Sequence, residues 1–181
     1  MRRGVVILDR DGTLNVERRY LSDPTQVELI DGAADGLRHL RALGVELLVI
    51  TNQSGVGRGY FTERTLDAIH CRLGECLSAA GVDLSAIYVC PHAPADGCRC
   101  RKPGIALLER AARERGFDPR DVFVIGDKAS DVEMGRRAGS TTLLVRTGYG
   151  ADVAAEGNVN ADFVVDDLRE AARVIEGLLP R

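Results

Sequence analysis

The sequence predicts an α/β fold, with an open, mainly parallel sheet that carries helices on both faces. Two observations predict it. Short apolar runs rich in β-branched residues alternate with stretches of helical spacing along the chain. The runs lack the apolar–polar alternation of a strand with one face in water, which is typical of parallel strands buried on both faces. Because helical stretches connect the runs, we expect right-handed crossovers and a Rossmann-like order of elements.

Six short apolar runs are the predicted strands, and five longer stretches are the predicted helices. The strands are residues 5–8, 45–50, 87–89, 122–125, 141–145 and a weaker run, 163–165. The helices lie within residues 31–44, 62–80, 105–116, 130–139 and 168–179. In the first helix Leu37, Leu40 and Leu43 share one face and Gly44 ends it, while Thr62 caps the second.

The length and composition of the chain predict one globular domain in water. A chain of 181 residues fits a single domain, residues 1–181, with 45% apolar and 28% charged residues. The net charge of −3 indicates no nucleic-acid partner. No apolar run approaches the roughly 20 residues that span a bilayer, and Asp9 and Asp11 interrupt any signal-peptide core. We therefore expect a cytoplasmic protein, acting as a monomer, without a membrane partner.

Polar residues stand where three of the predicted strands end. Asp9 and Asp11 follow the first strand, Thr51 and Asn52 the second, and Asp127 the fourth. The carboxyl ends of parallel strands meet at one edge of a sheet, where ligands bind. Two neighbouring carboxylates repel each other unless a metal or substrate separates their charges. The alternative for Asp-Gly after a strand is a hairpin turn, but the following residues, NVERRY, make a poor partner strand.

An aspartate at a strand end, near a second carboxylate, is suited to phosphoryl transfer. Asp9 is the predicted nucleophile, which would form an aspartyl phosphate. Asp11, two residues further on, would protonate the leaving alcohol and later take a proton from the attacking water. Mg²⁺ prefers oxygen ligands and offsets carboxylate and phosphate charge. We expect Asp9, Asp11 and Asp127 to hold it, with Asp131 in support.

The two lysines of the chain mark the same chemistry. Only Lys102 and Lys128 are lysines among 24 basic residues; the rest are arginines. A compact ammonium suits a single phosphoryl oxygen better than a planar guanidinium does. We expect Lys102 and the Thr51 hydroxyl to hold phosphoryl oxygens, and Lys128, next to Asp127, to lie near the site.

The stretch CPHAPADGCRC predicts a second metal. The candidate ligands form a C-x-H-x5-C-x-C pattern and are Cys90, His92, Cys98 and Cys100. Five cysteines are an odd number, which disfavours a disulfide framework. Three thiolates and an imidazole complete a tetrahedral Zn²⁺ shell without room for water, so the site would be structural and would staple the loop that leads to Arg101 and Lys102. The alternative is a set of unrelated thiols, as we expect for Cys71 and Cys76 in the core.

Four motifs in order resemble those of the haloacid dehalogenase superfamily. They are DRDGT at residues 9–13, a strand ending at Thr51, Lys102, and GDKASD at residues 126–131. The resemblance covers nearly the whole chain. It implies Mg²⁺-dependent hydrolysis through an aspartyl phosphate, with a side-chain oxygen of Asp9 and the backbone carbonyl of Asp11 on the metal. The chain has no room for a large inserted cap domain, so the site should be open.

The zinc loop resembles that of two groups in this superfamily, the heptose 1,7-bisphosphate phosphatases and the histidinol-phosphate phosphatases. TNQSGVGRGYF from Thr51 and CRKPG from Cys100 resemble the heptose enzymes, whereas the short gap between His92 and Cys98 resembles the histidinol enzymes. The predicted activity is removal of the 7-phosphate from D-glycero-D-manno-heptose 1,7-bisphosphate. The alternatives are a histidinol-phosphate phosphatase and a non-catalytic, zinc-stabilised binding module.

The resemblance also implies which residues meet the sugar phosphate. They are Glu17, Arg18, Arg19, Tyr20, Asn52, Gln53, Ser54, Arg58 and Lys128. Arg101, between a zinc ligand and Lys102, is expected to bind either the transferring phosphate or a second one. The alternative for the arginines is that they are solvated surface charges.

Overall fold

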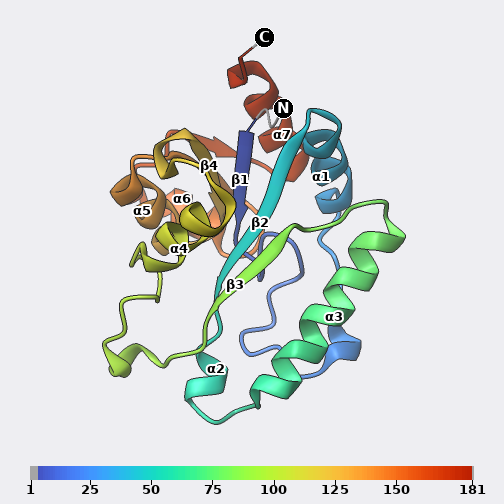
Figure 1. Cartoon of the computed structure of the whole chain (residues 1–181), viewed down its shortest axis with the longest axis vertical. Helices are drawn as coiled ribbons and strands as arrows, with labels where there is room; N and C mark the ends of the chain where they lie inside the picture. Colours follow the sequence, from blue (N-terminus) through green and yellow to red (C-terminus); the bar gives the residue numbers. More distant parts are fainter. Residues whose placement is uncertain (1–3, 181) are drawn as a thin grey trace.

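The computed structural model describes residues 4–180 and contains a six-stranded sheet in the order β3-β2-β1-β4-β5-β6 (Figure 1). All neighbouring strands run parallel. The strands are β1 (Gly4–Leu8), β2 (Val45–Asn52), β3 (Ala86–Cys90), β4 (Val122–Gly126), β5 (Thr141–Val145) and β6 (Phe163–Val165). The six predicted strands and the open parallel sheet are therefore confirmed.

The described residues also form seven α-helices. They are α1 (Ala33–Ala42), α2 (Ser54–Gly57), α3 (Glu63–Ala79), α4 (Ala106–Arg115), α5 (Ala129–Ala138), α6 (Gly150–Glu156) and α7 (Leu168–Leu178). The five predicted helices are confirmed. Helices α2 and α6 were not predicted, because segments this short and rich in glycine or alanine carry little apolar periodicity. Among residues 4–180, no helix combines the length and apolarity needed to cross a bilayer.

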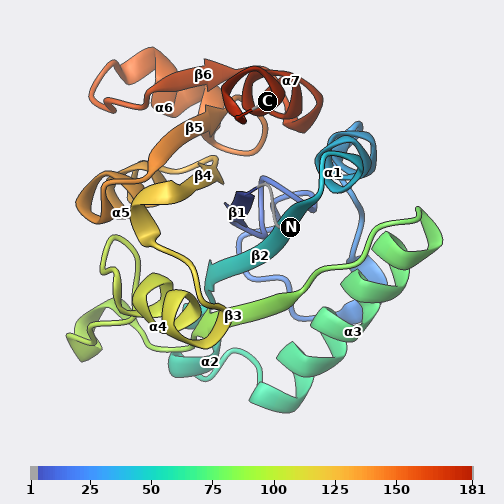
Figure 2. The ribbon, with the colours of Figure 1, turned by 45° about the horizontal axis from the view of Figure 1, so that its top comes forward.

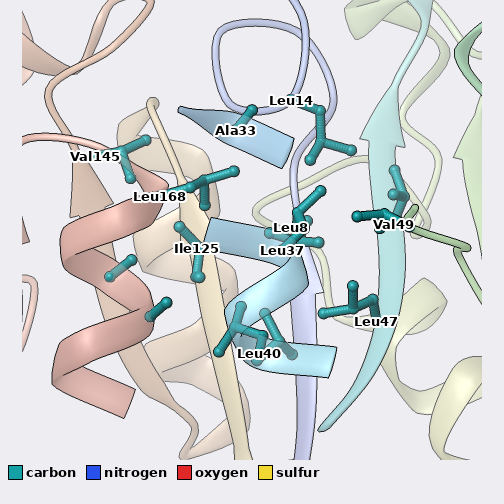
Figure 3. Close-up of a cluster of buried hydrophobic side chains, with 14 of the residues drawn as sticks. Leu8, Leu14, Ala33, Leu37, Leu40, Leu47, Val49, Ile125, Val145 and Leu168 are labelled. Carbon is teal, nitrogen blue, oxygen red and sulfur yellow. The ribbon is translucent and has the colours of Figure 1, made fainter. Parts of the chain in front are cut away.

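Helices α1, α3 and α7 cover one face of the sheet, and α4 and α5 cover the other (Figure 2). On the first face Leu8 and Leu47 of the sheet pack with Leu37 and Leu40 of α1 and Leu168 of α7 (Figure 3). These leucines are at most 2% exposed. Burial on both faces explains why the strands lack polar alternation.

Local sequence sets several helix ends as expected. The Thr62 hydroxyl accepts a hydrogen bond from the backbone N–H of Thr65 at the start of α3. Gly116 and Gly139 end α4 and α5 with positive φ angles of 71° and 78°, which glycine adopts without strain. The expectation that both remaining cysteines are core residues is wrong for Cys71. It is exposed, whereas Cys76 packs against the core, because the two lie on different sides of α3.

The register of the sheet brings the predicted strand ends together. Leu8 pairs with Val49 of β2 and with Ile125 of β4. The backbone N–H of Asp9 then donates to the Ile125 carbonyl at 2.9 Å. The residues that follow β1, β2 and β4 therefore lie at one edge of the sheet.

We predict that the packing between α1 and the sheet supplies a large share of the stability. Leu40→Ala, at a fully buried position, should lower the free energy of unfolding by about 2–5 kcal/mol through lost burial and a residual cavity. Leu178→Ala on α7, where the side chain is 47% exposed, should cost under about 1 kcal/mol. Urea denaturation of both variants measures the difference; equal losses would contradict this description of the core.

Candidate active site

Three buried carboxylates meet at the carboxyl edge of the sheet. Asp9 follows β1, Asp127 follows β4, and Asp131 lies in the first turn of α5. One ligand oxygen from each lies within 4.8 Å of the others. The backbone N–H of Lys128 donates to Asp131 Oδ2 at 3.0 Å, which fixes that carboxylate against the strand end. This cluster is the candidate magnesium site.

The hydrogen bonding and the pKa of Asp127 indicate whether the cluster suits a cation. Within residues 4–180 its buried Oδ1 has no hydrogen-bond partner, and the nearest cation, Lys128 Nζ, lies 3.8 Å away. Burial raises the pKa of Asp127 to about 8; Asp9 also raises it, while Lys128 opposes both. A Cβ on Gly12 would lie 2.1 Å from Asp127 Oδ2, so glycine there leaves the space the carboxylate occupies. A hard divalent cation would keep such a carboxylate ionised, and an all-oxygen donor set fits Mg²⁺.

Asp9 is held ionised by the two lysines. Burial would raise the pKa of Asp9, but the ammonium groups of Lys102 and Lys128 outweigh burial and lower it. Lys102 Nζ donates to Asp9 Oδ1 at 2.8 Å, and Lys128 Nζ lies 3.9 Å from Asp9 Oδ2. An ionised carboxylate is the form that can attack phosphorus.

Lys102 Nζ has three oxygen atoms around it, each within 2.8 Å. Besides Asp9, its Nζ contacts Asp131 Oδ1 at 2.6 Å and donates to the Ile50 carbonyl at 2.7 Å. A phosphoryl oxygen would have to displace one of these acceptors. Thr51, the other predicted phosphoryl ligand, is buried and its hydroxyl accepts from Gln53 Nε2 at 2.8 Å.

Asp11 is not part of the three-carboxylate cluster, and its side chain has other partners. Its Oδ1 accepts from Asn15 Nδ2 at 2.9 Å, and its Oδ2 accepts from Gln53 Nε2 at 2.8 Å and from Arg10 Nε at 3.1 Å. This arrangement leaves the backbone carbonyl of Asp11 as its expected metal ligand and its carboxylate for proton transfer.

Three residues that contact the site were not predicted from the sequence: Arg10, His70 and Asn15. Arg10 is only 1% exposed, and its Nη1 lies 3.1 Å from His70 Nε2 of α3. An arginine between two aspartates is typical of a solvated turn, so the local sequence does not predict that Arg10 is buried. Only the position of Asn15, four residues after Asp11 in the same turn, could have suggested its contact.

A cavity of about 460 Å³ opens beside the carboxylates. Its lining includes eight predicted site residues and two that were not predicted, Ser130 and Tyr149. The eight are Glu17, Arg19, Tyr20, Asn52, Ser54, Arg101, Lys102 and Lys128. Arg101 Nη1 is buried there without a hydrogen-bond partner. Lys128 Nζ contacts Glu17 at 2.8 Å. The lining has more cations than anions, with Arg19, Arg101, Lys102 and Lys128 against Glu17.

Three predicted substrate contacts do not line this cavity. Arg18 forms an exposed ion pair with Glu28 at 2.7 Å, and Arg58 is exposed beyond α2. Gln53 is buried and faces Thr51 and Asp11. Substrate contacts by these residues therefore stay predictions.

The predicted zinc ligands converge. Cys90 Sγ lies 3.6 Å from Cys98 Sγ and 3.2 Å from Cys100 Sγ, and His92 Nδ1 lies 3.2 Å from Cys100 Sγ. Four donors about 2.0–2.3 Å from a shared Zn²⁺ stand at similar separations. Burial raises the pKa of Cys90 to about 12, so a cation is needed to hold its thiolate at neutral pH. The donor set fits zinc.

The zinc loop is tied to the end of β2. Gln53 donates from its backbone to the Cys90 carbonyl at 2.7 Å. The Asn52 side chain accepts from the backbone N–H of Lys102 and donates to its carbonyl. The loop thus places Lys102 beside Asp9 through contacts at both of its ends.

Comparisons with known proteins agree with this geometry. A model of the HAD-hydrolase-like family matches residues 99–171. The D-glycero-beta-D-manno-heptose-1,7-bisphosphate 7-phosphatases of Pasteurella multocida and Yersinia pestis are each 37% identical to the chain, over 96% and 94% of it and 97% and 94% of their own lengths. The chain belongs to the haloacid dehalogenase-like hydrolase family.

The fold of this haloacid dehalogenase-like hydrolase is similar to the solved structures of the same kind of enzyme. A D,D-heptose 1,7-bisphosphate phosphatase from B. bronchiseptica, complexed with magnesium and phosphate, has a TM-score of 0.91 at 33% identity, covering 97% of this chain and 99% of its own. Another from Burkholderia thailandensis has a TM-score of 0.74 at 30% identity, with 96% and 98% covered.

We predict that the cysteine cluster binds zinc and holds the loop in place. Cys98→Ala should abolish zinc in metal analysis of the purified protein and lower Tm by roughly 5 °C or more, because each kcal/mol shifts Tm by about 2–4 °C at this size. Hydrogen exchange should increase around Arg101 and Lys102. Cys71→Ala, at an exposed position, should change neither zinc content nor Tm. Wild-type protein without zinc, purified without chelator, would contradict this assignment.

Proposed function

We propose that this protein is a Mg²⁺-dependent phosphatase that removes the 7-phosphate of D-glycero-D-manno-heptose 1,7-bisphosphate. The observation that carries the proposal is the ionised Asp9, 2.8 Å from Lys102 and within a cluster of three buried carboxylates. The activity named for relatives that share 37% of their residues with the chain supports the substrate. None of the five cysteines, all of which lie within residues 4–180, forms a disulfide, which favours a reducing, cytoplasmic location. That location and a monomeric state are parts of the proposal.

The reaction takes place in two displacements at phosphorus. An Asp9 oxygen forms a bond to phosphorus as the bond to the sugar oxygen breaks, and Asp11 gives that oxygen its proton. Asp11 then takes a proton from water as the water oxygen attacks phosphorus and releases Asp9. Asp9, Asp127 and the Asp11 carbonyl would hold Mg²⁺, which would supply positive charge to offset that of the phosphoryl oxygens. Lys102 supplies a fixed positive charge beside Asp9 throughout.

The cavity suits a substrate with two phosphates. Arg101, with a buried Nη1 that lacks a partner, and the exposed Arg19 lie on its lining with Lys128. A guanidinium binds phosphate bidentately, which lets a remote phosphate position the reacting one. The short gap between His92 and Cys98 favours histidinol phosphate as the second candidate substrate. A non-catalytic binding module is disfavoured, because it needs neither Asp9 nor Lys102 in this arrangement.

The covalent mechanism predicts a sharp loss of activity without loss of fold. Asp9→Asn should retain its circular dichroism spectrum and lower kcat by at least about 10³-fold, since an amide is a poor nucleophile. Removing Mg²⁺ from wild-type protein should stop turnover reversibly and leave Tm nearly unchanged if zinc is retained. Phosphate release measures both; wild-type activity in Asp9→Asn would exclude the aspartyl phosphate.

The substrate assignment predicts how Arg101 contributes. Arg101→Ala should lower kcat/KM for heptose 1,7-bisphosphate by about tenfold or more, and lower it less for heptose 7-phosphate, because a charged hydrogen bond is worth about 1.5–3 kcal/mol. Arg113→Ala, on the exposed side of α4, should have no effect. Wild-type kcat/KM should be higher for the bisphosphate than for histidinol phosphate; the opposite order would give the activity to the second candidate.

A further inference from the structure

A buried guanidinium stands next to the proposed proton donor. Arg10 is among the largest fully buried side chains, although its charge costs free energy to remove from water. Its Nη2 lies 2.8 Å from Asp11 Oδ2 and donates to Gln53 Oε1 at 3.0 Å. Gln53 Nε2 in turn donates to the same Asp11 oxygen at 2.8 Å. Arg10 and Gln53 therefore hold one oxygen of the Asp11 carboxylate from two sides.

This arrangement distinguishes the two oxygens of Asp11. Among the residues that the structure describes, Oδ2 accepts from Arg10 and Gln53, whereas Oδ1 accepts only from Asn15. Each carboxylate oxygen has about two lone-pair sites. Oδ2 is thus saturated, and Oδ1 retains a site that can carry a proton. Rotation of the carboxylate would break the contacts at Oδ2, so its orientation depends on Arg10 staying in place.

His70 is the group that holds the far end of Arg10. The imidazole Nε2 lies 3.1 Å from Arg10 Nη1. A guanidinium has donors only, so Nε2 must be the unprotonated, accepting nitrogen and the ring proton lies on Nδ1. Burial, together with the charge of Arg10, lowers the pKa of His70 to about 4, so the ring is neutral at pH 7. His70 belongs to α3, whose buried residues Leu66, Ile69 and Leu73 anchor it to the core.

We propose that His70 is a positioning residue for proton transfer: by accepting from Arg10 Nη1, it keeps Arg10 and Gln53 on Asp11 Oδ2 and so orients the Asp11 carboxylate toward the leaving oxygen. The inference deepens the proposed function and rests on it. Among residues 4–180, His70 is neither a member of the carboxylate cluster nor part of the cavity lining. Its hydrogen bond to Arg10 is therefore the contact through which it would position Asp11.

The proposal predicts which substrates depend on His70. General acid catalysis matters most when the leaving oxygen is basic and departs poorly without a proton. A sugar alcohol and phenol are such leaving groups, whereas p-nitrophenol leaves readily as its anion. The value of kcat/KM reports the steps up to release of this group. A misdirected Asp11 should therefore lower kcat/KM for phenyl phosphate and the heptose bisphosphate, but hardly for p-nitrophenyl phosphate.

The experiment compares three replacements of His70. His70→Leu removes the acceptor at similar volume, His70→Asn is too short to reach Arg10, and His70→Gln places an amide oxygen near the position of Nε2. We expect His70→Leu and His70→Asn to lower kcat/KM about tenfold for phenyl phosphate and less than about twofold for p-nitrophenyl phosphate. His70→Gln should restore both values to within about twofold of wild type, because it restores the acceptor.

The matched control is His39→Leu. His39 lies on α1 and pairs with Glu176 at 3.0 Å, on the surface, so its loss should leave both substrates unaffected. Equal losses on both substrates in His70→Asn would show a merely structural role and overturn the proposal, as would unchanged kinetics or failure of His70→Gln to rescue. A wild-type protein that hydrolyses none of the phosphates would instead overturn the proposed function, and the inference with it.

Discussion

The constraint on which the structure depends is the burial of three carboxylates within 4.8 Å of one another. Asp9, Asp127 and Asp131 repel each other in a region that water barely reaches. Lys102 and Lys128 offset part of this charge, yet Asp127 Oδ1 still lacks a hydrogen-bond partner. Without a further cation, burial and the neighbouring carboxylates raise the pKa of Asp127 to about 8, so that carboxyl is readily protonated.

The position of Lys102 links this site to the zinc loop. The lysine lies on a segment with few buried apolar residues, 93 positions from Asp9 along the chain. Its backbone is held by Asn52 at the end of β2, and the cysteine cluster closes the loop just before it. A metal bound there would supply the rigidity that packing supplies elsewhere in the protein. The proposed zinc site would then position the charge on which the proposed magnesium site depends.

Arg10 forms a buried ion pair with Asp11, as Lys102 does with Asp9. Each aspartate of the DRDGT turn has a buried cation as its partner, and the two cations are of different kinds. The compact ammonium sits between carboxylates, where a single charge is shared. The planar guanidinium sits among Asp11, Gln53 and His70, where its separate donors fix directions. This difference matches the two tasks that we propose, attack on phosphorus by Asp9 and directed proton transfer by Asp11.

The sequence by itself determined the parallel sheet, the positions of the strand ends and the reactive and metal-binding residue types that follow them. These depend on local patterns: apolar runs without alternation, glycines after helices, and the acidic, hydroxyl and thiol residues that follow strands. Helices α2 and α6 were not predicted, because they are too short to show a helical repeat of apolar residues. Only the tertiary structure decided that Arg10 is buried, that Cys71 is exposed and that Gln53 faces Asp11. The reason is physical. A polar side chain at a strand end can meet several partners, and the choice among them is made by elements such as α3 that pack against the sheet from 60 residues away.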